Sequence, residues 1–208
     1  MEHKIIVVGI GPGSPDYLVP VAKRKIEAAK VLIGSTRALA AYSTCQQITQ
    51  VIDRNLAAVM LFITKQLQFS DVVVMVSGDP GYYSLLPALR KEFTDRTLEV
   101  IPGISSFQLA FTRISRPWQD VRLLSMHGRE IDAADLVYNP GQTLSLLTDA
   151  IHNPQSIAKK LIAGGWPATV TAYLCANLSY AQEKIVTASL AEVTAIDGFD
   201  HAVMVVEG

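Results

Sequence analysis

The sequence predicts an α/β fold that contains a parallel β-sheet. Apolar runs typical of buried strands end repeatedly in glycine-rich turns, and segments with helical spacing of apolar residues follow them. The run Val72–Val76 has no polar residue, as expected for a central strand covered on both faces. Half of the 208 residues are apolar and only 18% are charged, below the roughly 25% of typical soluble domains. This composition indicates a large buried surface, in a two-sided sheet or at an oligomer contact.

The first half of the chain alternates expected strands and helices. The first strand, Ile5–Val8, is a β-branched run that stops at Gly9. A helix is expected at residues 19–29, with Pro20 in its first turn and apolar residues on one face. Short apolar runs then alternate with helically spaced segments. The further expected strands are 31–34, 47–53, 71–77 and 98–101, and the further expected helices are 36–42, 56–69, 85–93 and 107–114.

A break in this pattern predicts a domain boundary. Residues 115–120, Ser-Arg-Pro-Trp-Gln-Asp, interrupt the apolar periodicity and separate a domain at 1–114 from one at 118–208. Beyond the break, the expected strands are 121–126, 143–147, 169–174, 184–189 and 201–206, and the expected helices are 154–163 and 190–193. The sequence shows no internal repeat at solenoid period and no low-complexity segment.

Charge and cysteine content exclude several classes of protein. The net charge of −1 offers no general attraction to nucleic acid or to an anionic membrane. Cys45 and Cys175 are far apart and have no histidine at metal-ligand spacing, so we expect two reduced thiols in core or half-buried positions and no metal. No apolar stretch approaches the roughly 20 residues that span a bilayer, and Ile5–Val8 is too short for a signal-peptide core. We therefore expect a cytoplasmic protein.

The turn after the first strand, Gly9–Asp16, resembles a nucleotide-binding loop but fits no phosphate motif. A dinucleotide fingerprint that starts at Gly9 and Gly11 needs its third glycine where Ser14 stands. It also needs an acid after the second strand, where the chain reads Gly34-Ser35-Thr36. No Gly-Lys-Ser/Thr follows any turn, which excludes a Walker loop. A glycine turn by itself is equally consistent with a purely structural loop.

Three such turns together predict a binding site. Gly11–Gly13, Gly78–Gly81 and Pro102–Ser106 each follow an expected strand. If these strands lie in one parallel sheet, their carboxyl ends share one edge, and the three turns line one crevice there. Such a crevice offers backbone donors and acceptors, one carboxylate and two hydroxyls. This chemistry suits a zwitterionic ligand with an adenine and a ribose.

These residues resemble the tetrapyrrole methylase family, whose members use S-adenosylmethionine on a non-Rossmann fold. The matching segments are Val8–Leu18, Ser77–Gly81 and Val100–Ser106, and the resemblance covers nearly the whole chain. Within the family, the chain looks most like the members that methylate carbon 5 of precorrin-7 or its cobalt form. Shorter segments carry this narrower match: Ser125–Arg129, Leu147–Asp149 and Cys175–Ser179. One departure is Ala176, where the family pattern leads us to expect an acid.

The resemblance implies two α/β domains with a cleft between them, a homodimer, S-adenosylmethionine as cofactor and a corrin precursor as substrate. Because the chain is too short for the extra domain that this step would need, we expect a separate enzyme to methylate carbon 15 and remove the acetate carboxyl. By motif, the implied cofactor contacts are Pro12, Asp79, Tyr82, Ser105, Ser106, Leu147, Thr148, Asn177 and Leu178. The candidate substrate contacts are Ser14, Asp16, Tyr83, His127 and Arg129, with Arg113, Arg116 and Arg37 as further candidates for clamping carboxylates.

A methyl group on a sulfonium is already activated, so alignment and exclusion of water are the main requirements and no strong base is needed. The sequence accordingly fixes no catalytic residue. His127 is a candidate for handling a proton, and Asp79 for positioning the cofactor. The alternative interpretations are an ordinary loop histidine and a turn acid that caps the next helix.

Two other functions are consistent with the residues. One is a methyltransferase of the same fold with a different target, such as another ring carbon, a ribosomal nucleotide or a modified histidine (diphthamide) precursor. The other is a non-enzymatic nucleotide-binding module, in which the glycine clusters are only turns.

Overall fold

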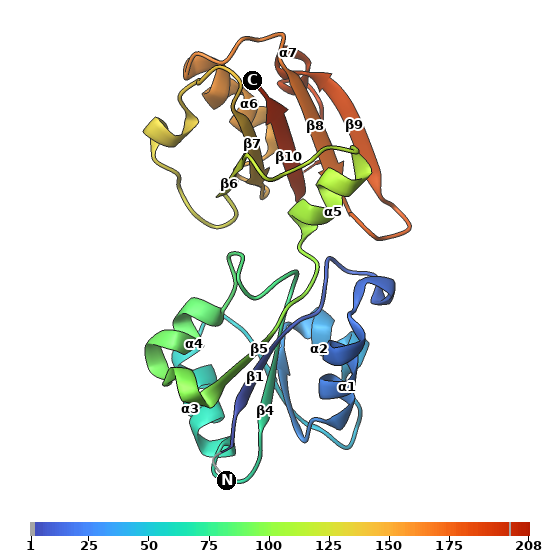
Figure 1. Ribbon diagram of the computed structural model, residues 1–208, viewed down its shortest axis with the longest axis vertical. Helices are drawn as coiled ribbons and strands as arrows, with labels where there is room; N and C mark the ends of the chain where they lie inside the picture. Colours follow the sequence, from blue (N-terminus) through green and yellow to red (C-terminus); the bar gives the residue numbers. More distant parts are fainter. Residues whose placement is uncertain (1–2, 200) are drawn as a thin grey trace. The chain divides into compact units, whose positions relative to one another are not determined.

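The computed structural model describes residues 3–199 and 201–208. Its contacts divide the chain into two compact units, Met1–Ser105 and Ser106–Gly208, and each unit contains one five-stranded sheet (Figure 1). The predicted α/β class is confirmed in both units.

The first unit is an all-parallel sheet between two pairs of helices. Its strands are β1 (Ile5–Gly9), β2 (Val31–Gly34), β3 (Ile48–Val51), β4 (Val72–Val76) and β5 (Leu98–Ile101). They lie in the order β3-β2-β4-β1-β5, and every pairing is parallel. The helices are α1 (Pro20–Ala28), α2 (Thr36–Tyr42), α3 (Leu56–Gln66) and α4 (Leu86–Glu92). Figure 1 shows α1 and α2 on one side of the sheet and α3 and α4 on the other.

Alternation along the strands builds two cores in this unit. Ile5 and Val7 of β1 pack with Val59 and Ile63 of α3, whereas Ile6 and Val8 pack with α1 and α2 on the opposite face. Neighbouring side chains on a strand point to opposite faces, so only a run apolar at every position can fill both cores. Burial of each such aliphatic side chain contributes roughly 1.5–3 kcal/mol.

The second unit is a mixed sheet. Its strands are β6 (Val121–Ser125), β7 (Thr143–Leu147), β8 (Thr171–Ala176), β9 (Lys184–Ser189) and β10 (Ala202–Glu207), in the order β6-β7-β10-β8-β9. Only the β6–β7 pairing is parallel; the other three are antiparallel. The helices α6 (Pro154–Ala163) and α7 (Leu190–Val193) supply Ile157, Leu161 and Val193 to a core shared with the sheet. Trp166 is buried in this core and donates from Nε1 to the carbonyl oxygen of Leu136, over 2.9 Å.

Helix α5 (Ser106–Arg113) belongs to the second unit, whereas the expected first domain, residues 1–114, included it. Its buried face carries Phe107 and Phe111, and the helix contacts β10. Phe107 packs edge-on against Trp118, with 5.4 Å between ring centroids. The polar segment after α5 is tied to the second sheet too, because Arg116 pairs with Glu207 at 2.8 Å. The break in apolar pattern therefore marks a loop within the second unit.

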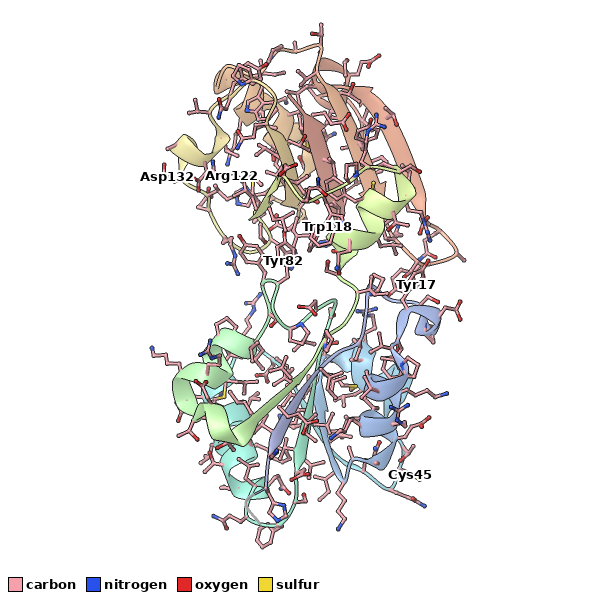
Figure 2. The ribbon with its side chains drawn as sticks, in the orientation of Figure 1. Tyr17, Cys45, Tyr82, Trp118, Arg122 and Asp132 are labelled. Carbon is pink, nitrogen blue, oxygen red and sulfur yellow. The ribbon has the colours of Figure 1, made fainter. Side chains whose placement is uncertain are left out.

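The remaining expected elements lie within a few residues of the observed ones, and three short 3-10 helices were not expected: Pro15–Tyr17, Asp95–Thr97 and Ala133–Leu136. Both cysteines are free thiols, Cys175 buried as expected and Cys45 exposed, contrary to expectation (Figure 2). In the described part of the chain, no helix is long and apolar enough to span a membrane.

Candidate functional site

The three glycine-rich turns of the first unit meet at the carboxyl edge of its sheet. Strand β1 pairs with both β4 and β5, so the turns that follow these strands are neighbours. Gly11 and Gly78 exchange two backbone hydrogen bonds, 3.3 Å and 2.8 Å long, in an isolated antiparallel bridge. The predicted clustering of the turns is confirmed, and it follows directly from the strand order.

The glycines at the base of these turns allow one backbone to pack on another. A Cβ atom at Gly9 would lie 2.6 Å from the Gly103 amide nitrogen, and one at Gly103 would lie 2.2 Å from the Gly78 carbonyl oxygen. Neither position tolerates a side chain. At Gly9 and Gly103 the space that a side chain would occupy is therefore filled by the backbone of neighbouring turns. Gly11 has a φ of 76°, a conformation that favours glycine.

The Asp79 carboxylate ties two of the turns together. Its Oδ1 accepts from the Gly81 amide at 2.7 Å, and its Oδ2 accepts from the Gly103 amide at 3.0 Å. The alternative role as a helix cap is not found: α4 begins at Leu86, and its N-cap residue, Leu85, makes no side-chain capping bond. Asp79 therefore fixes the turn after β4 against the turn after β5.

Several other candidates lie on these same turns. Tyr82, labelled in Figure 2, contacts Tyr83 edge to face, with 4.8 Å between ring centroids. Tyr83 has a φ of 47°. Two effects raise the pKa of Tyr82 above its ordinary value: mainly burial, and to a smaller extent the neighbouring Tyr83. This phenol therefore stays protonated. Ser14 accepts from the Asp16 amide and caps the 3-10 helix, and the Asp16 side chain is exposed.

Further members of the candidate set are Pro12, which is half-buried, Ser105, which is buried, and Ser106, which begins α5. Arg37, proposed as a clamp for carboxylates, donates from Nη2 to the Ser77 hydroxyl at the end of β4.

In the second unit, one group of predicted residues lies at the carboxyl ends of β6 and β7: His127, Arg129, Leu147 and Thr148. His127 follows β6, and its Nδ1 is 3.2 Å from the Thr148 carbonyl oxygen. Because a carbonyl only accepts, the ring donates from Nδ1 in this contact, and a neutral ring then keeps its lone pair on Nε2. Leu147 ends β7, and the hydroxyl of the buried Thr148 both donates to the Ala202 carbonyl and accepts from the Ala202 amide. The Thr148 hydroxyl therefore serves the fold.

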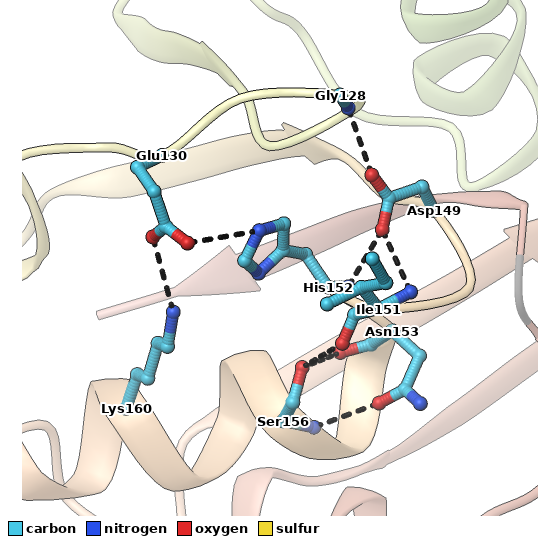
Figure 3. Close-up of polar contacts among 8 residues, drawn as sticks. All are labelled: Gly128, Glu130, Asp149, Ile151, His152, Asn153, Ser156 and Lys160. Carbon is cyan, nitrogen blue, oxygen red and sulfur yellow. Dashed lines mark hydrogen bonds and ion pairs between the residues drawn. The ribbon is translucent and has the colours of Figure 1, made fainter.

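Asp149 organises the loop that carries His127 and Arg129 (Figure 3). Its carboxylate accepts from three backbone amides: Gly128 at 2.8 Å, Ile151 at 2.8 Å and His152 at 2.6 Å. These bonds, that of Gly128 foremost, lower the pKa of Asp149 to about 2. The sequence showed Asp149 only as part of a motif, and its role depends on a contact 21 residues away that no local pattern reveals.

A second ionic contact holds the same loop. Glu130 lies 3.3 Å from His152 Nε2 and 3.7 Å from Lys160 Nζ of α6 (Figure 3). Arg129 is exposed between these two anchored positions, as a group that binds a substrate carboxylate would need to be.

Two of the arginines named as clamps are engaged in the fold. Arg113 makes a bidentate pair with Glu183, and Arg116 binds Glu207 and the Tyr173 hydroxyl. The candidate cofactor contacts Asn177 and Leu178 lie in the turn after β8, where Asn177 has a φ of 51° and Leu178 is buried. Sequence reasoning missed Glu183, which has no recognisable motif around it.

Comparison of the sequence with protein-family models identifies a known family that includes both units. The family model described as Tetrapyrrole (Corrin/Porphyrin) Methylases matches residues 4–194. The chain belongs to the tetrapyrrole methylase family.

Relatives within this family were found in sequence and in structure. The chain is 30% identical to the probable cobalt-precorrin-7 C(5)-methyltransferase of Methanocaldococcus jannaschii, over 98% of each chain. It is 29% identical to the precorrin-6Y C(5,15)-methyltransferase [decarboxylating] of a Sinorhizobium species, over 78% of this chain and 39% of the relative. The crystal structure of the precorrin-6Y methylase of cobalamin biosynthesis from Archaeoglobus fulgidus superposes with a TM-score of 0.75, at 25% identity over 99% and 98% of the two chains.

Proposed function

We propose that this tetrapyrrole methylase transfers a methyl group from S-adenosylmethionine to carbon 5 of a corrin precursor, cobalt-precorrin-7 or precorrin-6Y, in cobalamin biosynthesis. The observation that carries the proposal is the match to the M. jannaschii protein, which extends over 98% of both chains. This match includes both units and all the loops described above.

The loops of the first unit fit the proposed cofactor. The three turns, residues 9–18, 77–85 and 102–107, contain no lysine or arginine of their own, and Asp16 and Asp79 are their acids. The Arg37 guanidinium lies beside one turn, where it donates to the Ser77 hydroxyl. The residues of the turns themselves suit a positively charged sulfonium better than a phosphate, which would favour basic groups. When bound, S-adenosylmethionine supplies a methyl group that is activated by the positive charge on its sulfur.

The proposal gives each candidate residue a task. The turns of the first unit hold the cofactor through their backbone, with Pro12, Tyr82, Ser105 and Ser106 as contacts and Asp79 as the group that fixes their geometry. In the second unit, the proposed contacts are Leu147, Asn177 and Leu178, and Thr148 through its main chain. Ser14, Asp16, Tyr83, His127 and Arg129 are assigned to the macrocycle.

Alignment is the main chemical task in this mechanism. Methyl transfer to carbon 5 would require the turns to hold the reacting carbon and the methyl group in line and to exclude water. Rigid turns serve this purpose, because the bridge between Gly11 and Gly78 and both Asp79 bonds restrict their motion. The unprotonated Nε2 of His127 is the proposed acceptor for a proton that the macrocycle loses.

We also propose that the enzyme is a homodimer and that a second polypeptide methylates carbon 15 and removes the carboxyl group. The Sinorhizobium relative, whose name includes both C5 and C15, is matched over only 39% of its length. The M. jannaschii relative, matched over 98%, is named for carbon 5 alone. This contrast favours a separate C15 enzyme.

Two measurements test the proposed function. Calorimetry with S-adenosylhomocysteine should show binding, and the absence of heat at millimolar ligand would contradict any enzymatic role. Incubation with cobalt-precorrin-7 and S-adenosylmethionine should yield a product with one added methyl group, located at carbon 5 by NMR. A methyl group at another carbon would favour the alternative target within the family.

A further inference from the structure

The turn that joins β8 to β9 has an unusual backbone. Asn177 has a φ of 51° and Ser179 a φ of 73°, so two residues that carry a Cβ adopt the left-handed conformation within three positions. This conformation costs roughly 1–2 kcal/mol for most residues with a Cβ, and asparagine adopts it more readily than others, so the cost falls chiefly on Ser179. The β8–β9 pairing runs up to Ala176 and Lys184. A strained turn persists only where its surroundings hold it, and such strain gathers at functional sites.

The Glu183 carboxylate binds the backbone of this turn. Its Oε2 accepts from the Ser179 amide at 2.6 Å, directly at one of the two left-handed residues. Two backbone bonds complete the turn: the Tyr180 amide donates to Asn177 and the Glu183 amide donates to Tyr180, each at 3.0 Å. The carboxylate thus binds the turn through a charge-assisted bond, roughly twice as strong as a neutral one.

Arg113 fixes the orientation of the Glu183 carboxylate. It is the last residue of α5, and it donates from Nε to Oε1 at 2.5 Å and from Nη2 to Oε2 at 3.3 Å. The side chains of Arg113 and Glu183 are 31% and 22% exposed, so water screens this pair less than a surface pair. Arginine presents a planar fork that matches both carboxylate oxygens, which lysine cannot reproduce. The ion pair therefore orients Glu183 toward the Ser179 amide.

We propose that Glu183 is a positioning residue: oriented by Arg113, it holds the turn with Asn177 and Ser179 in the left-handed conformation, the geometry that presents Asn177 and Leu178 to the cofactor. This proposal rests on the proposed function, which assigns Asn177 and Leu178 to S-adenosylmethionine. It assigns Arg113 to the turn and not to substrate carboxylates.

The test compares variants that remove the carboxylate, its partner or the strain. Glu183→Gln should accelerate hydrogen exchange of the Ser179 amide in cofactor-free protein and weaken S-adenosylhomocysteine binding about tenfold, as loss of a charge-assisted hydrogen bond does. Arg113→Lys should act in the same direction and provides the test if Glu183→Gln fails to fold. KM for S-adenosylmethionine should rise more than kcat falls, because the variants leave the reacting groups unchanged.

Rescue by glycine distinguishes positioning from general stability. Ser179→Gly placed in the Glu183→Gln background should recover most of the affinity, since glycine adopts this φ without steric strain. Glu192→Gln is the matched control: Glu192 also accepts bonds from a backbone amide and a hydroxyl in the second unit, in the capping box of α7. This control should leave affinity for S-adenosylhomocysteine unchanged.

Two results would overturn the inference, and they are distinguishable. Unchanged affinity of Glu183→Gln, with a wild-type protein that binds, would contradict the positioning role alone. A wild-type protein that binds no S-adenosylhomocysteine would contradict the proposed function and with it the purpose assigned to the turn, whatever the exchange rate of Ser179.

Discussion

At the residue scale, Asp79 illustrates a side chain whose chemistry is used within the protein. One carboxylate oxygen accepts a hydrogen bond from the Gly81 amide and the other from the Gly103 amide. The group thereby fixes the turns that, in the proposed function, bind the cofactor. Such a carboxylate affects ligand binding indirectly, by fixing the positions of the turns that contact the ligand. Its removal should consequently affect folding and binding together.

Asp79→Ala leaves two amides without their acceptor, and we expect the free energy of unfolding to fall by about 1–3 kcal/mol. Affinity for S-adenosylhomocysteine should fall at least tenfold, because the turns after β4 and β5 lose their link. Urea unfolding and calorimetry measure the two effects. Asp95→Ala is the control, since Asp95 forms an exposed pair with Arg90 and should change neither quantity measurably. Full affinity in Asp79→Ala would show that the link is dispensable.

Gly103 tests the close approach of the turns. An alanine Cβ there would lie 2.2 Å from the Gly78 carbonyl oxygen, a contact that only a shift of the backbone can relieve. Overpacking of this kind destabilises by about 1–3 kcal/mol or more, so we expect Gly103→Ala to lower the midpoint of thermal unfolding by several degrees. At Gly81 a Cβ would meet no backbone atom of another turn, and its contact with Asp79 Oδ1 at 3.0 Å is relieved by a shift of a few tenths of an ångström that keeps both Asp79 hydrogen bonds. A Gly81→Ala variant as unstable as Gly103→Ala would contradict this explanation.

At the scale of elements, local patterns predicted strands and helices well because the sheets are built from apolar runs that few other structures could bury. The run Val72–Val76 required two covered faces, and the structure supplies them with α1 and α2 on one side and α3 and α4 on the other. Clustering of the glycine turns followed from the same logic, because the strands that precede them are adjacent and parallel.

Contacts distant in sequence could not be predicted in this way. Arg113 and Glu183 are 70 residues apart, and neither position carries a signal that distinguishes an ion pair from a substrate clamp. Helix α5 was assigned to the wrong side of the boundary because polar residues at 115–120 mark a loop, and a loop does not reveal which sheet the preceding helix packs on. The close packing at Gly9 and Gly103 could not be predicted for the same reason: the backbone that fills their side-chain space comes from another turn.

The packing of α5 on the second unit is testable. Phe111 is 1% exposed, and truncation of a buried phenylalanine typically lowers stability by about 3–5 kcal/mol. We expect Phe111→Ala to shift the urea unfolding curve followed by tryptophan fluorescence, since Trp118 and Trp166 both lie in the second unit. Val137→Ala, at an exposed apolar position of the same unit, should leave the curve nearly unchanged. An unshifted curve for Phe111→Ala would place α5 elsewhere.

At the scale of the whole molecule, acid should destabilise the second unit through its hydrogen-bonded carboxylates. Backbone and side-chain bonds lower the pKa of Asp149, Glu183 and Glu192 below their ordinary values, and that of Asp149 falls from 3.8 to about 2. A carboxyl whose pKa is lower in the folded state binds fewer protons there than in the unfolded chain. Its contribution to stability is therefore complete above the unfolded pKa and is lost as pH falls through the folded pKa.

The effect of acid can be tested at Asp149 by comparing the unfolding free energies of wild type and Asp149→Asn. Asp149→Asn should be less stable than wild type at pH 7, where the native carboxylate is charged and accepts from Gly128, Ile151 and His152. As pH falls from about 4 to about 2, wild type loses this contribution and the variant has none to lose, so the difference in unfolding free energy should shrink. Urea unfolding followed by tryptophan fluorescence at pH 7, 5, 4 and 3 measures it. A difference that stays constant down to pH 3 would mean that the introduced amide disturbs the loop by its shape, with no contribution from the carboxylate charge.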